Sequence, residues 1–456
     1  MNRVTKRSWL MGAFILLLLG GMGFFVAEYV FQADTWVVST GSPHVYKGSN
    51  LGNGTVVDRN DVVLLDIDEN RTYSDNAQTR AATLHWLGDR SGSIQAKAVG
   101  HYAAIMAGYD KVDGLYNFAG TGGVEHLTLS AQIQNAALSA LNGRKGTVGI
   151  YNYKTGEILC AVTSPTYDPD NVPDLTGESY EGVYLNRFLQ SSYVPGSIFK
   201  IVTAAAALEC VSDIESRSFT CTGKYEYGED TAVTCETAHG TLDLKGALAH
   251  SCNCAFAQIA KLVGRKNMEK YVEKFGITKP VSFDGVTSAS GNYDISNTGG
   301  ASFAWSCIGQ HTDLVNPARF MTFMGTIAAG GKGLEPFLVS AVTRGEETLY
   351  EASAQKTDRI MSERTAQTLQ QYLRNNVQTI YGDGNFPGLS VCAKSGTSQL
   401  GGGKRSNAMF AGFLMDEEYP LAFIVVVENG GYGASACVPV LSQVLQACKT
   451  ELDSRP

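Results

Sequence analysis

The longest apolar run of the chain lies at its N-terminus. Residues 8–27 are mostly apolar and contain no charged side chain, and Arg3, Lys6 and Arg7 precede them. A run of about 20 such residues is long enough for a helix that crosses a bilayer. Because positive charges precede the run and none directly follows it, we expect the N-terminus in the cytoplasm and the rest of the chain outside the cell membrane.

A cleaved signal peptide is the alternative to this anchor. The apolar core of a signal peptide usually spans about 7 to 15 residues and is followed by a small-x-small cleavage motif. The run in this chain is longer, and no such motif follows it. We therefore expect residues 1–34 to form a short cytoplasmic segment and a single transmembrane anchor.

Apolar or alternating runs near the C-terminus predict three neighbouring strands, over residues 389–398, 408–415 and 421–427. Gly401-Gly-Gly403 and Asp416-Glu-Glu418 separate these runs and are typical of turns. The residues after the last strand, 434–452, have the amphipathic pattern of a closing helix.

Further strands and helices are predicted earlier in the chain. Ser130 is placed to cap a helix over residues 131–141, and the apolar runs 147–153 and 157–162 flank a turn at Lys154. A long, mainly helical middle follows. Strands at both ends with helices between them predict an α+β domain with one antiparallel sheet.

The segment from residue 35 to residue 122 has a different character. It is rich in glycine, polar and only weakly periodic, with a hairpin predicted around Asp58 to Asp61. Because domains commonly contain about 100 to 200 residues, we expect a small domain over residues 35–122 and a larger one over residues 123–456.

Three short motifs carry the candidate chemistry: Ser197-Ile-Phe-Lys200, Ser251-Cys-Asn253 and Lys394-Ser-Gly-Thr397. The first offers a hydroxyl nucleophile with an amine one helical turn away. The second adds a hydroxyl and an amide, and the third adds a cation and hydroxyls on either side of a glycine. Together, in this order, they predict a serine acyltransferase.

Each motif is short enough to occur by chance, and each has a second match in the chain. Ser353 to Lys356 lies among polar residues, and no Ser-x-Asn follows it. Ser290-Gly-Asn292 lies in a stretch typical of a loop, and Lys154-Thr-Gly156 precedes every candidate nucleophile. We therefore assign the chemistry to the other three motifs.

The surroundings of Ser197 favour a functional role. Pro195-Gly196 interrupt the preceding structure and residues 198–208 favour a helix, so Lys200 lies on the same face as Ser197. The alternative is a serine that only caps the helix and a solvated lysine. However, Lys200 lies in an apolar helix, where an ammonium group without a partner is costly.

From about residue 40 to its end, the chain resembles the monofunctional (class B) penicillin-binding proteins, the D,D-transpeptidases of bacterial cell-wall synthesis. The three motifs match those of the family, and they follow one another at 54 and 143 residues. The other similar stretches are Asn186-Arg187, Tyr193 to Lys200, Asp58-Arg59-Asn60, Ile308-Gly-Gln310, Asn316-Pro317, Phe410 to Phe413 and Val425 to Asn429.

The resemblance implies a fold and a reaction. The fold would be an antiparallel five-stranded sheet with helices on both sides, preceded by a small pedestal domain and one transmembrane helix. The Lys394 motif would lie on an edge strand that faces the Ser197 helix. The reaction would crosslink peptidoglycan stem peptides by acyl transfer, with release of D-alanine from D-Ala-D-Ala.

The resemblance also implies the catalytic roles. Ser197 would be the nucleophile, and Lys200 would accept its proton. Ser251 would pass a proton to the leaving D-alanine, while Asn253 would hold the substrate backbone and the lysine. Lys394 would keep the site positive.

The third motif would bind the substrate. Ser395 and Thr397 would bind the terminal carboxylate, and the backbone N–H groups of Ser197 and Thr397 would form the oxyanion hole. Gly396 would leave room for the substrate to lie along the strand. β-Lactams would acylate the same serine because they resemble D-Ala-D-Ala.

The segment before residue 123 is too short for a glycan-polymerising domain, so we expect a monofunctional protein. The resemblance implies a separate membrane glycosyltransferase as its partner. Three alternatives remain at this stage. A β-lactamase would need a group that activates water, and none is evident. A β-lactam receptor would need a cytoplasmic output domain. A non-catalytic scaffold of a division or elongation complex would keep the fold without the reaction.

The net charge of −8, with no basic run beyond the N-terminal flank, argues against a nucleic-acid partner. A phosphate-binding loop is not expected either, since Gly401-Gly-Gly403-Lys404 leads into a strand and not into a helix. We expect no cofactor.

All ten cysteines lie at or after Cys160, in the part expected outside the membrane, where disulfides can form. Cys221 and Cys235 flank a predicted hairpin and are the candidate disulfide. Cys252 and Cys254 are too closely spaced to be two zinc ligands, and the seven histidines form no cluster in the sequence. We therefore expect no metal.

Overall fold

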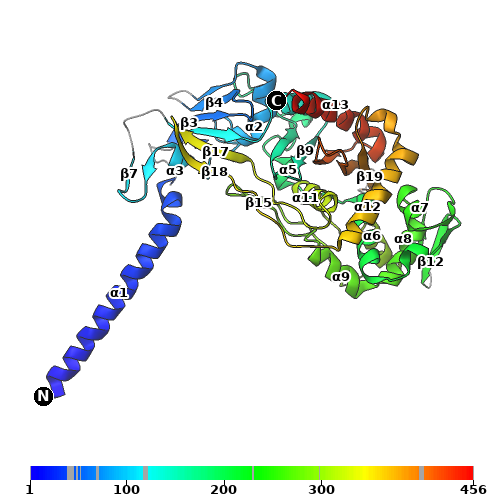
Figure 1. The fold of residues 1–456 in the computed structure, drawn as a ribbon, viewed down its shortest axis with the longest axis horizontal. Helices are drawn as coiled ribbons and strands as arrows, with labels where there is room; N and C mark the ends of the chain where they lie inside the picture. Colours follow the sequence, from blue (N-terminus) through cyan, green and yellow to red (C-terminus); the bar gives the residue numbers. More distant parts are fainter. Residues whose placement is uncertain are drawn as a thin grey trace.

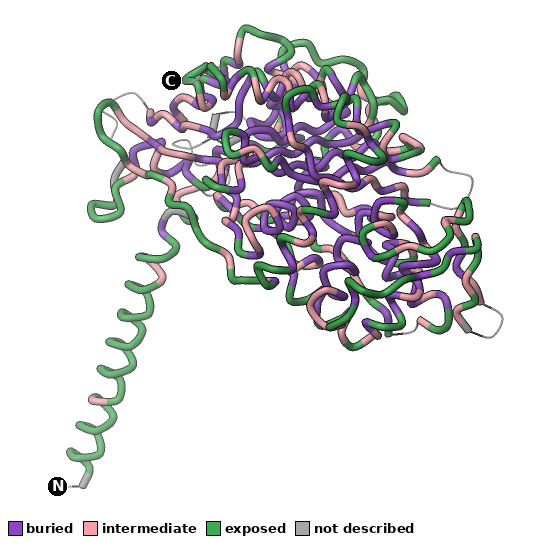
Figure 2. Tube along the Cα trace, turned by 45° about the vertical axis from the view of Figure 1, so that its right-hand side comes forward, coloured by how far each residue is buried: buried purple, intermediate pink, exposed green. Residues whose placement is uncertain are grey.

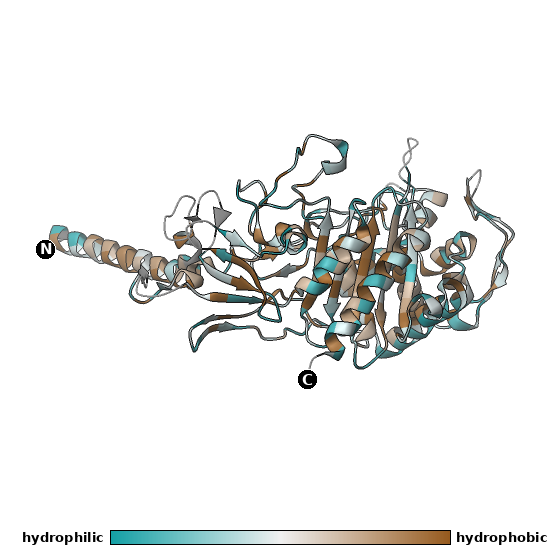
Figure 3. Ribbon diagram, turned by 90° about the horizontal axis from the view of Figure 1, so that it is seen from above, coloured by the Kyte–Doolittle hydropathy of each residue, from teal (hydrophilic) through white to brown (hydrophobic). Residues whose placement is uncertain are grey.

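A long N-terminal helix stands away from the rest of the molecule (Figure 1). This helix, α1 (Asn2–Val37), contains a stretch of mean hydropathy 2.3 that is long and apolar enough to cross a membrane. The residues whose burial is described are exposed along almost the whole helix (Figure 2), and the helix is mainly apolar (Figure 3). The predicted apolar helix is therefore confirmed, while its orientation in a membrane stays a prediction.

The computed structural model describes residues 2–38, 46–47, 50–51, 53–67, 71–116, 122–228, 231–296, 298–399 and 405–454.

An antiparallel sheet of five strands lies at the centre of the rest of the chain. Its order is β10-β9-β21-β20-β19, so β19 is an edge strand, as the resemblance implied. The five strands lie within two residues of their predicted positions, although the turn expected at 401–403 is outside the described residues. The strands are β9 (Gly146–Asn152), β10 (Ile158–Ser164), β19 (Val391–Ser398), β20 (Asn407–Leu414) and β21 (Leu421–Val427).

The sheet is apolar on both faces because helices cover both. Along β21, Phe423 and Val425 belong to one hydrophobic core, and Ile424 and Val426 belong to the other. This arrangement confirms the predicted α+β fold, with a five-stranded antiparallel sheet between helices. The helices on the first face are α4 (Ala131–Leu141) and α13 (Gly433–Asp453), and those on the second are α5 (Arg187–Gln190) and α11 (Pro317–Ala328).

A further group of helices lies beside β19, at the end of the molecule away from α1 (Figure 1). These helices are α6 (Lys200–Cys210), α7 (Leu244–Ala249), α8 (Asn253–Val263), α9 (Arg265–Lys274), α10 (Ala301–Ile308) and α12 (Glu363–Asn376). The helical middle is therefore confirmed, but small antiparallel pairs interrupt it, two of them between α6 and α8. They are β11 (Phe219–Cys221) with β14 (Gly240–Leu242), and β12 (Lys224–Gly228) with β13 (Thr231–Thr234).

A second sheet connects the N-terminal region to the rest of the chain. Its order is β18-β17-β8-β3-β4-β5, and it contains the predicted hairpin of β3 and β4. Strands from both sides of residue 122 contribute to it, and the division of the chain at this residue stays a prediction. The strands are β3 (Gly54–Val57), β4 (Val63–Ile67), β5 (Thr72–Tyr73), β8 (Val124–Leu127), β17 (Val339–Arg344) and β18 (Glu347–Glu351).

The buried carboxylate of Asp58 ties this hairpin to α4. Oδ1 accepts the backbone N–H groups of Asn60 at 2.8 Å and Val62 at 2.9 Å, which closes the turn. Oδ2 accepts the N–H of Ala131 at 2.9 Å, at the first position of α4. A carboxylate at a helix N-terminus is favourable for the helix as well. Asp58 belongs to a stretch that carries the family resemblance, and its role here is structural.

Shorter elements complete the fold. They are β1 (Tyr46–Lys47), β2 (Asn50–Leu51), α2 (Ala77–Leu87), α3 (Ala103–Met106), β6 (Tyr109–Asp110), β7 (Leu115–Tyr116), β15 (Ser282–Phe283) and β16 (Val286–Thr287), the 3-10 turns η1 (Glu178–Tyr180), η2 (Gly196–Phe199), η3 (Ile214–Ser216) and η5 (Asp383–Asn385), and the π-helical turn η4 (Val377–Tyr381).

One buried histidine should make stability depend on pH. His85, in α2, is 2% exposed, and its Nε2 lies 2.7 Å from the carbonyl oxygen of Val183. Burial lowers the pKa of His85 to about 4. Below about pH 6.5 the unfolded chain takes up this proton, whereas the folded chain does so only near pH 4. The free energy of unfolding should therefore fall by about 3 kcal/mol from this group as the pH falls through that range.

Guanidinium unfolding at pH 7 and at pH 4.5 measures the effect. His85→Gln should reduce the loss of stability between the two pH values, and His101→Gln, which removes an exposed histidine, should not. An equal loss of stability in the His85→Gln variant and the wild-type chain would contradict the prediction.

Candidate active site

Ser197 lies in a turn that requires a glycine. The turn η2 leads directly into α6, so the helix predicted over residues 198–208 is confirmed with a tighter first turn. Gly196 has a φ of 56°, in the left-handed region. A Cβ on Gly196 would lie 2.5 Å from the carbonyl oxygen of Thr397. The turn that carries Ser197 therefore packs closely against β19.

The Lys200 amine brings the first two motifs together. Its Nζ lies 3.0 Å from Ser197 Oγ and 3.0 Å from Ser251 Oγ. It also donates to the carbonyl oxygen of Ser251 and to Oδ1 of Asn253, each at 2.7 Å. Lys200 is fully buried, whereas Ser197 is only half-buried. Four of the predicted residues thus meet at one nitrogen atom.

These contacts fit a neutral amine. The Ser251 carbonyl and the Asn253 Oδ1 can only accept, so each takes one N–H group. A neutral amine has two N–H groups and one lone pair, which then remains for a hydroxyl. The hydroxyls of Ser197 and Ser251 are equally near and can donate to this lone pair. Lys200 is therefore placed to act as a base toward either serine.

The electrostatics of the site favour the same state. Burial lowers the pKa of Lys200 well below its usual value, and the charge of Lys394 lowers it further. Burial also lowers the pKa of Lys394, to about 7. Unlike an exposed lysine, Lys200 can therefore be neutral near physiological pH and accept a proton.

Ser251 and Asn253 are held in place at the start of α8. Ser251 has a φ of 53°, which is unusual for a residue with a side chain and is typical of functional sites. Cys252 is the N-cap of α8. Asn253 donates from Nδ2 to the carbonyl oxygen of Thr234 at 2.9 Å, so its Oδ1 is turned toward Lys200.

The third motif lies on β19, beside the turn that carries Ser197. Lys394 is 1% exposed, and its Nζ donates to the carbonyl oxygen of Ser395 at 3.0 Å. The hydroxyl oxygen of Thr397 accepts the N–H of Gly433 at 3.0 Å, which leaves the O–H free to donate. Since β19 is an edge strand, one of its sides can pair with an extended peptide.

Gly396 has a packing role in the structure. A Cβ at this position would lie 2.5 Å from the carbonyl oxygen of Pro195. The absence of a side chain therefore lets β19 approach the nucleophile turn. This contact adds to the reason expected from the sequence, which was room for a substrate along the strand.

Two side chains at the site were given no role by the motifs. The hydroxyl of Tyr381 accepts the N–H of Ser395 at 2.9 Å, and it lies 2.9 Å from Ser395 Oγ and 3.5 Å from Lys394 Nζ. Gln310 donates to the carbonyl oxygen of Thr397 at 3.0 Å. Gln310 belongs to a stretch that carries the family resemblance, whereas no local pattern marks Tyr381.

A comparison with known protein families agrees with this geometry. The family described as the penicillin binding protein transpeptidase domain matches residues 146–446. The chain belongs to this family. The matched segment begins at β9 and ends within α13, so it contains all three motifs and the whole central sheet.

Individual penicillin-binding proteins are similar over a longer part of the chain. Peptidoglycan D,D-transpeptidase PbpA of Mycolicibacterium smegmatis is 28% identical over 347 residues, which cover 69% of each protein. The ceftriaxone acyl-enzyme complex of penicillin-binding protein A from M. tuberculosis has a TM-score of 0.75 at 22% identity, over 87% of this chain and 98% of that one. The D,D-transpeptidase domain of a peptidoglycan glycosyltransferase from Eggerthella lenta has a TM-score of 0.73 at 25% identity, over 90% and 100%.

Other residues that carry the resemblance to penicillin-binding proteins stabilise the segment that precedes the nucleophile turn. Arg187 Nε donates to Glu428 Oε1 at 2.8 Å, and the Tyr193 hydroxyl donates to the same oxygen at 2.9 Å. These contacts join the segment before the nucleophile turn to the residue that follows β21. Their role is structural.

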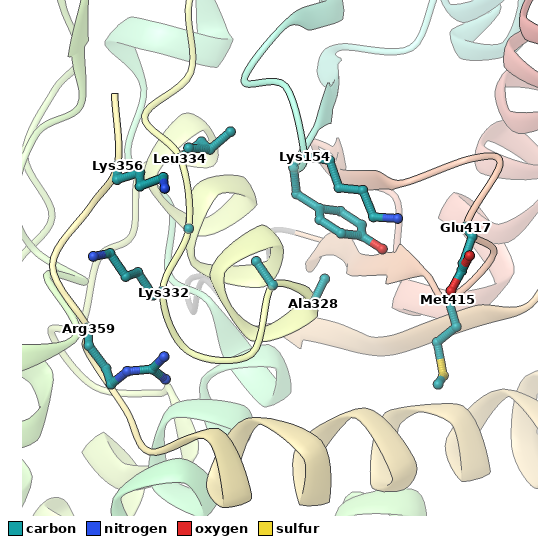
Figure 4. Close-up of a pocket in the computed structure, with 11 residues that line it drawn as sticks. Lys154, Ala328, Lys332, Leu334, Lys356, Arg359, Met415 and Glu417 are labelled. Carbon is teal, nitrogen blue, oxygen red and sulfur yellow. The ribbon is translucent and has the colours of Figure 1, made fainter. Parts of the chain in front are cut away.

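The second matches to the first and third motifs lie at a different place. Lys154 and Lys356 both line a cavity of about 780 Å³, together with Lys332 and Arg359 (Figure 4). None of the described lining residues is a serine. The hydroxyl of Ser353 instead accepts from Gln355 Nε2 at 3.1 Å. The chance matches therefore do not assemble a second nucleophilic site.

The cysteines form a group that the sequence did not predict. Cys221 and Cys235, expected to form a disulfide, both have free thiols. Cys235 Sγ lies 3.8 Å from Cys252 Sγ, and Cys221 Sγ lies 3.5 Å from His239 Nδ1. This corrects the expected pairing, and it brings one histidine, His239, to the cysteines. Cys235 and His239 come from one loop, but Cys221 and Cys252 come from two other segments, so spacing alone does not reveal the whole group.

Proposed function

We propose that this protein is a peptidoglycan D,D-transpeptidase that forms an acyl-enzyme on Ser197 and is a target of β-lactams. The observation that carries the proposal is the buried amine of Lys200, 3.0 Å from the hydroxyl oxygens of both Ser197 and Ser251. Membership of the penicillin-binding transpeptidase family supports it, as do the names of the relatives.

The first half of the reaction is acylation. Ser197 Oγ attacks the carbonyl carbon of the penultimate D-alanine of a stem peptide, and its proton passes to Lys200 Nζ. Backbone N–H groups of Ser197 and Thr397 stabilise the oxyanion. The bond to the terminal D-alanine then breaks, and the proton reaches the leaving amine through Ser251. The products are free D-alanine and an ester on Ser197.

The second half transfers the acyl group. An amine of a neighbouring stem peptide attacks the ester carbonyl, a new amide forms, and Ser197 recovers a proton through Lys200. With a β-lactam, the ring amide opens onto Ser197 and the ester remains. The ceftriaxone complex of the M. tuberculosis relative is described as such an acyl-enzyme.

The third motif is proposed to bind the terminal carboxylate. Lys394 supplies positive charge, and the hydroxyls of Ser395 and Thr397 donate hydrogen bonds. A bound carboxylate would raise the pKa of Lys394 from about 7 and so keep it charged. Asn253 is within reach of both Lys200 and a substrate backbone, and Gly396 leaves the edge of β19 open.

The same proposal includes a place for the protein in the cell. Helix α1 would cross the cytoplasmic membrane once, with the N-terminus inside, and residues 35–122 would form the pedestal. The proposed site lies at the end of the molecule away from α1 (Figure 1), which would let it reach the wall. A membrane glycosyltransferase that contacts the anchor and the pedestal is the proposed partner.

Acyl transfer from a synthetic stem peptide tests the function. The full chain in detergent should release D-alanine from a peptide that ends in D-Ala-D-Ala and should join the remainder to an added amine acceptor. A peptide that ends in L-Ala-L-Ala is the matched control and should not react. Turnover of a chromogenic cephalosporin at many molecules per second would instead favour a β-lactamase. Failure to release D-alanine, together with failure to bind penicillin, would favour a scaffold.

A further inference from the structure

Four side chains near the start of α8 bring their metal-binding atoms together. They are Cys221 at the end of β11, Cys235 after β13, His239 before β14 and Cys252 at the N-cap of α8. Three sulfur atoms and one imidazole nitrogen all lie within 4.8 Å of one another. The proposed acyl transfer makes no use of these side chains, so their arrangement needs a separate explanation.

The distances fit one tetrahedral zinc ion. With zinc–sulfur bonds of about 2.3 Å and zinc–nitrogen bonds of about 2.0 Å, two sulfur ligands lie about 3.8 Å apart and a sulfur and a nitrogen about 3.5 Å apart. Cys235 Sγ and Cys252 Sγ are 3.8 Å apart, and Cys221 Sγ and His239 Nδ1 are 3.5 Å apart. A disulfide would require two sulfur atoms at about 2 Å.

Backbone N–H groups point to two of the sulfur atoms, as they often do to the thiolate ligands of a metal. The backbone N–H of Cys254 points to Cys235 Sγ at 3.3 Å, and that of Ala255 points to Cys252 Sγ at 3.4 Å. Cys221 and Cys252 are buried, and the other two ligands are half-buried, as in a closed structural metal site.

We propose that Cys221, Cys235, His239 and Cys252 bind one Zn²⁺ ion. Three thiolates and one imidazole are a donor set that suits zinc, whereas magnesium and calcium prefer oxygen ligands. Four protein ligands fill the tetrahedral coordination, so the ion has a structural role and no open position for substrate. Binding would displace the remaining thiol protons.

The ion would hold the second motif in position. Cys252 separates Ser251 from Asn253 in the chain, and Asn253 Nδ2 donates to the carbonyl oxygen of Thr234, the residue before Cys235. Zinc would thus fix both segments that place Asn253 and Ser251 around Lys200. Through its bond to the adjacent Cys252, the ion would also stabilise the left-handed backbone conformation of Ser251. This positioning role of the ion rests on the proposed acyl transfer, whereas zinc binding itself does not.

Metal analysis of the purified full chain in detergent tests the binding site. We expect about one zinc ion per chain in the wild-type protein, and a loss of about 100-fold in zinc affinity in Cys235→Ser and in His239→Ala. Cys254→Ala is the matched control, because Cys254 Sγ points to the carbonyl oxygen of Val233 and lies outside the group. Cobalt in place of zinc should give the visible absorption of a tetrahedral thiolate site.

A wild-type chain without zinc that also takes up no cobalt would overturn the proposal. A disulfide between Cys235 and Cys252, found by mass spectrometry without reductant, would do so too, as would another metal at the site. Because all of these measurements use the wild-type chain, they remain decisive if the variants fail to fold.

The positioning role needs a separate measurement. Removal of zinc with a chelator should slow labelling of Ser197 by a fluorescent penicillin at least about tenfold, and added zinc should restore the rate. Unchanged labelling after full zinc removal would overturn the positioning role but not the metal site. Conversely, a chain that binds zinc and never reacts with penicillin or stem peptide would contradict the proposed function and leave the metal site intact.

Discussion

Ser197→Ala is expected to abolish the covalent adduct between the protein and a labelled penicillin. The adduct is an ester to Ser197 Oγ, and alanine provides no atom that can form it. The rate of labelling should fall on the order of 10⁴-fold or more, as in other enzymes that lose a nucleophile. Gel fluorescence after incubation of the full chain with a fluorescent penicillin measures the adduct. Release of D-alanine from a stem peptide should disappear with it.

The chain contains a matched control for this experiment. Ser353 lies in the other Ser-x-x-Lys sequence, is exposed and is hydrogen-bonded to Gln355. Ser353→Ala should therefore label at the wild-type rate. Ser197→Ala should still fold, because a half-buried hydroxyl contributes only about 1 kcal/mol. A folded Ser197→Ala variant that labels as fast as the wild-type chain would show that another residue is the nucleophile.

Much of the fold was predictable because its central elements carry local patterns. The apolar runs of β20 and β21 and the capped helix α4 are continuous in sequence, and the structure has them within two residues of their predicted ends. The second sheet was harder to predict from the sequence. Its strands β8 and β17 are short and lie more than 200 residues apart, so their pairing depends on tertiary structure and not on periodicity.

The candidate site, like the fold, could be predicted from the sequence only where its contacts are local. Ser197 and Lys200 are one helical turn apart, so their contact follows from local geometry. The arrangement of Ser251, Asn253 and the Lys394 motif around them was inferred from resemblance, because no rule of spacing brings such distant segments together. The role of Tyr381 is a purely tertiary contact, made through the backbone N–H of Ser395.

The cysteines illustrate why spacing can mislead. Cys221 and Cys235 flank a hairpin and so indicated a disulfide, yet both thiols are free, and they contact His239 and Cys252 respectively. Zinc sites such as those of zinc fingers are recognised in a sequence by closely spaced pairs of ligands. Cys235 and His239 are spaced as such a pair, but the other two members, Cys221 and Cys252, come from distant segments, so the sequence shows only half of the group.

Lys200→Met is expected to slow acylation on the order of 10²- to 10⁴-fold while leaving Ser197 in place. Methionine fills a similar volume but cannot accept the serine proton. Lys200→Arg should be equally slow, because a guanidinium stays protonated. Stopped-flow or time-resolved labelling with penicillin gives the acylation rate. Unlike the Ser197→Ala variant, both proteins should form the adduct slowly.

The matched control is Lys356→Met, in the other Ser-x-x-Lys sequence. Lys356 lines a different cavity, and its replacement should leave the acylation rate unchanged (Figure 4). Loss of the Lys200 amine also leaves the Ser251 carbonyl and the Asn253 Oδ1 without a donor. Folding should therefore be checked, since such unpaired groups cost about 1 to 3 kcal/mol each.

The dependence of acylation on pH separates proton transfer from a packing role of Lys200. In the wild-type chain the acylation rate should rise with pH as Lys200 loses its proton. Burial and the charge of Lys394 lower the pKa of Lys200. The rise should therefore be complete well below the pH at which an ordinary lysine loses its proton. The rate should then fall above about pH 7, where Lys394 loses the charge that attracts a carboxylate. In Lys200→Met the rise should vanish and the fall should remain. If Lys200→Met keeps both limbs of the profile, Lys200 supports the site only by packing, and another group takes the proton from Ser197.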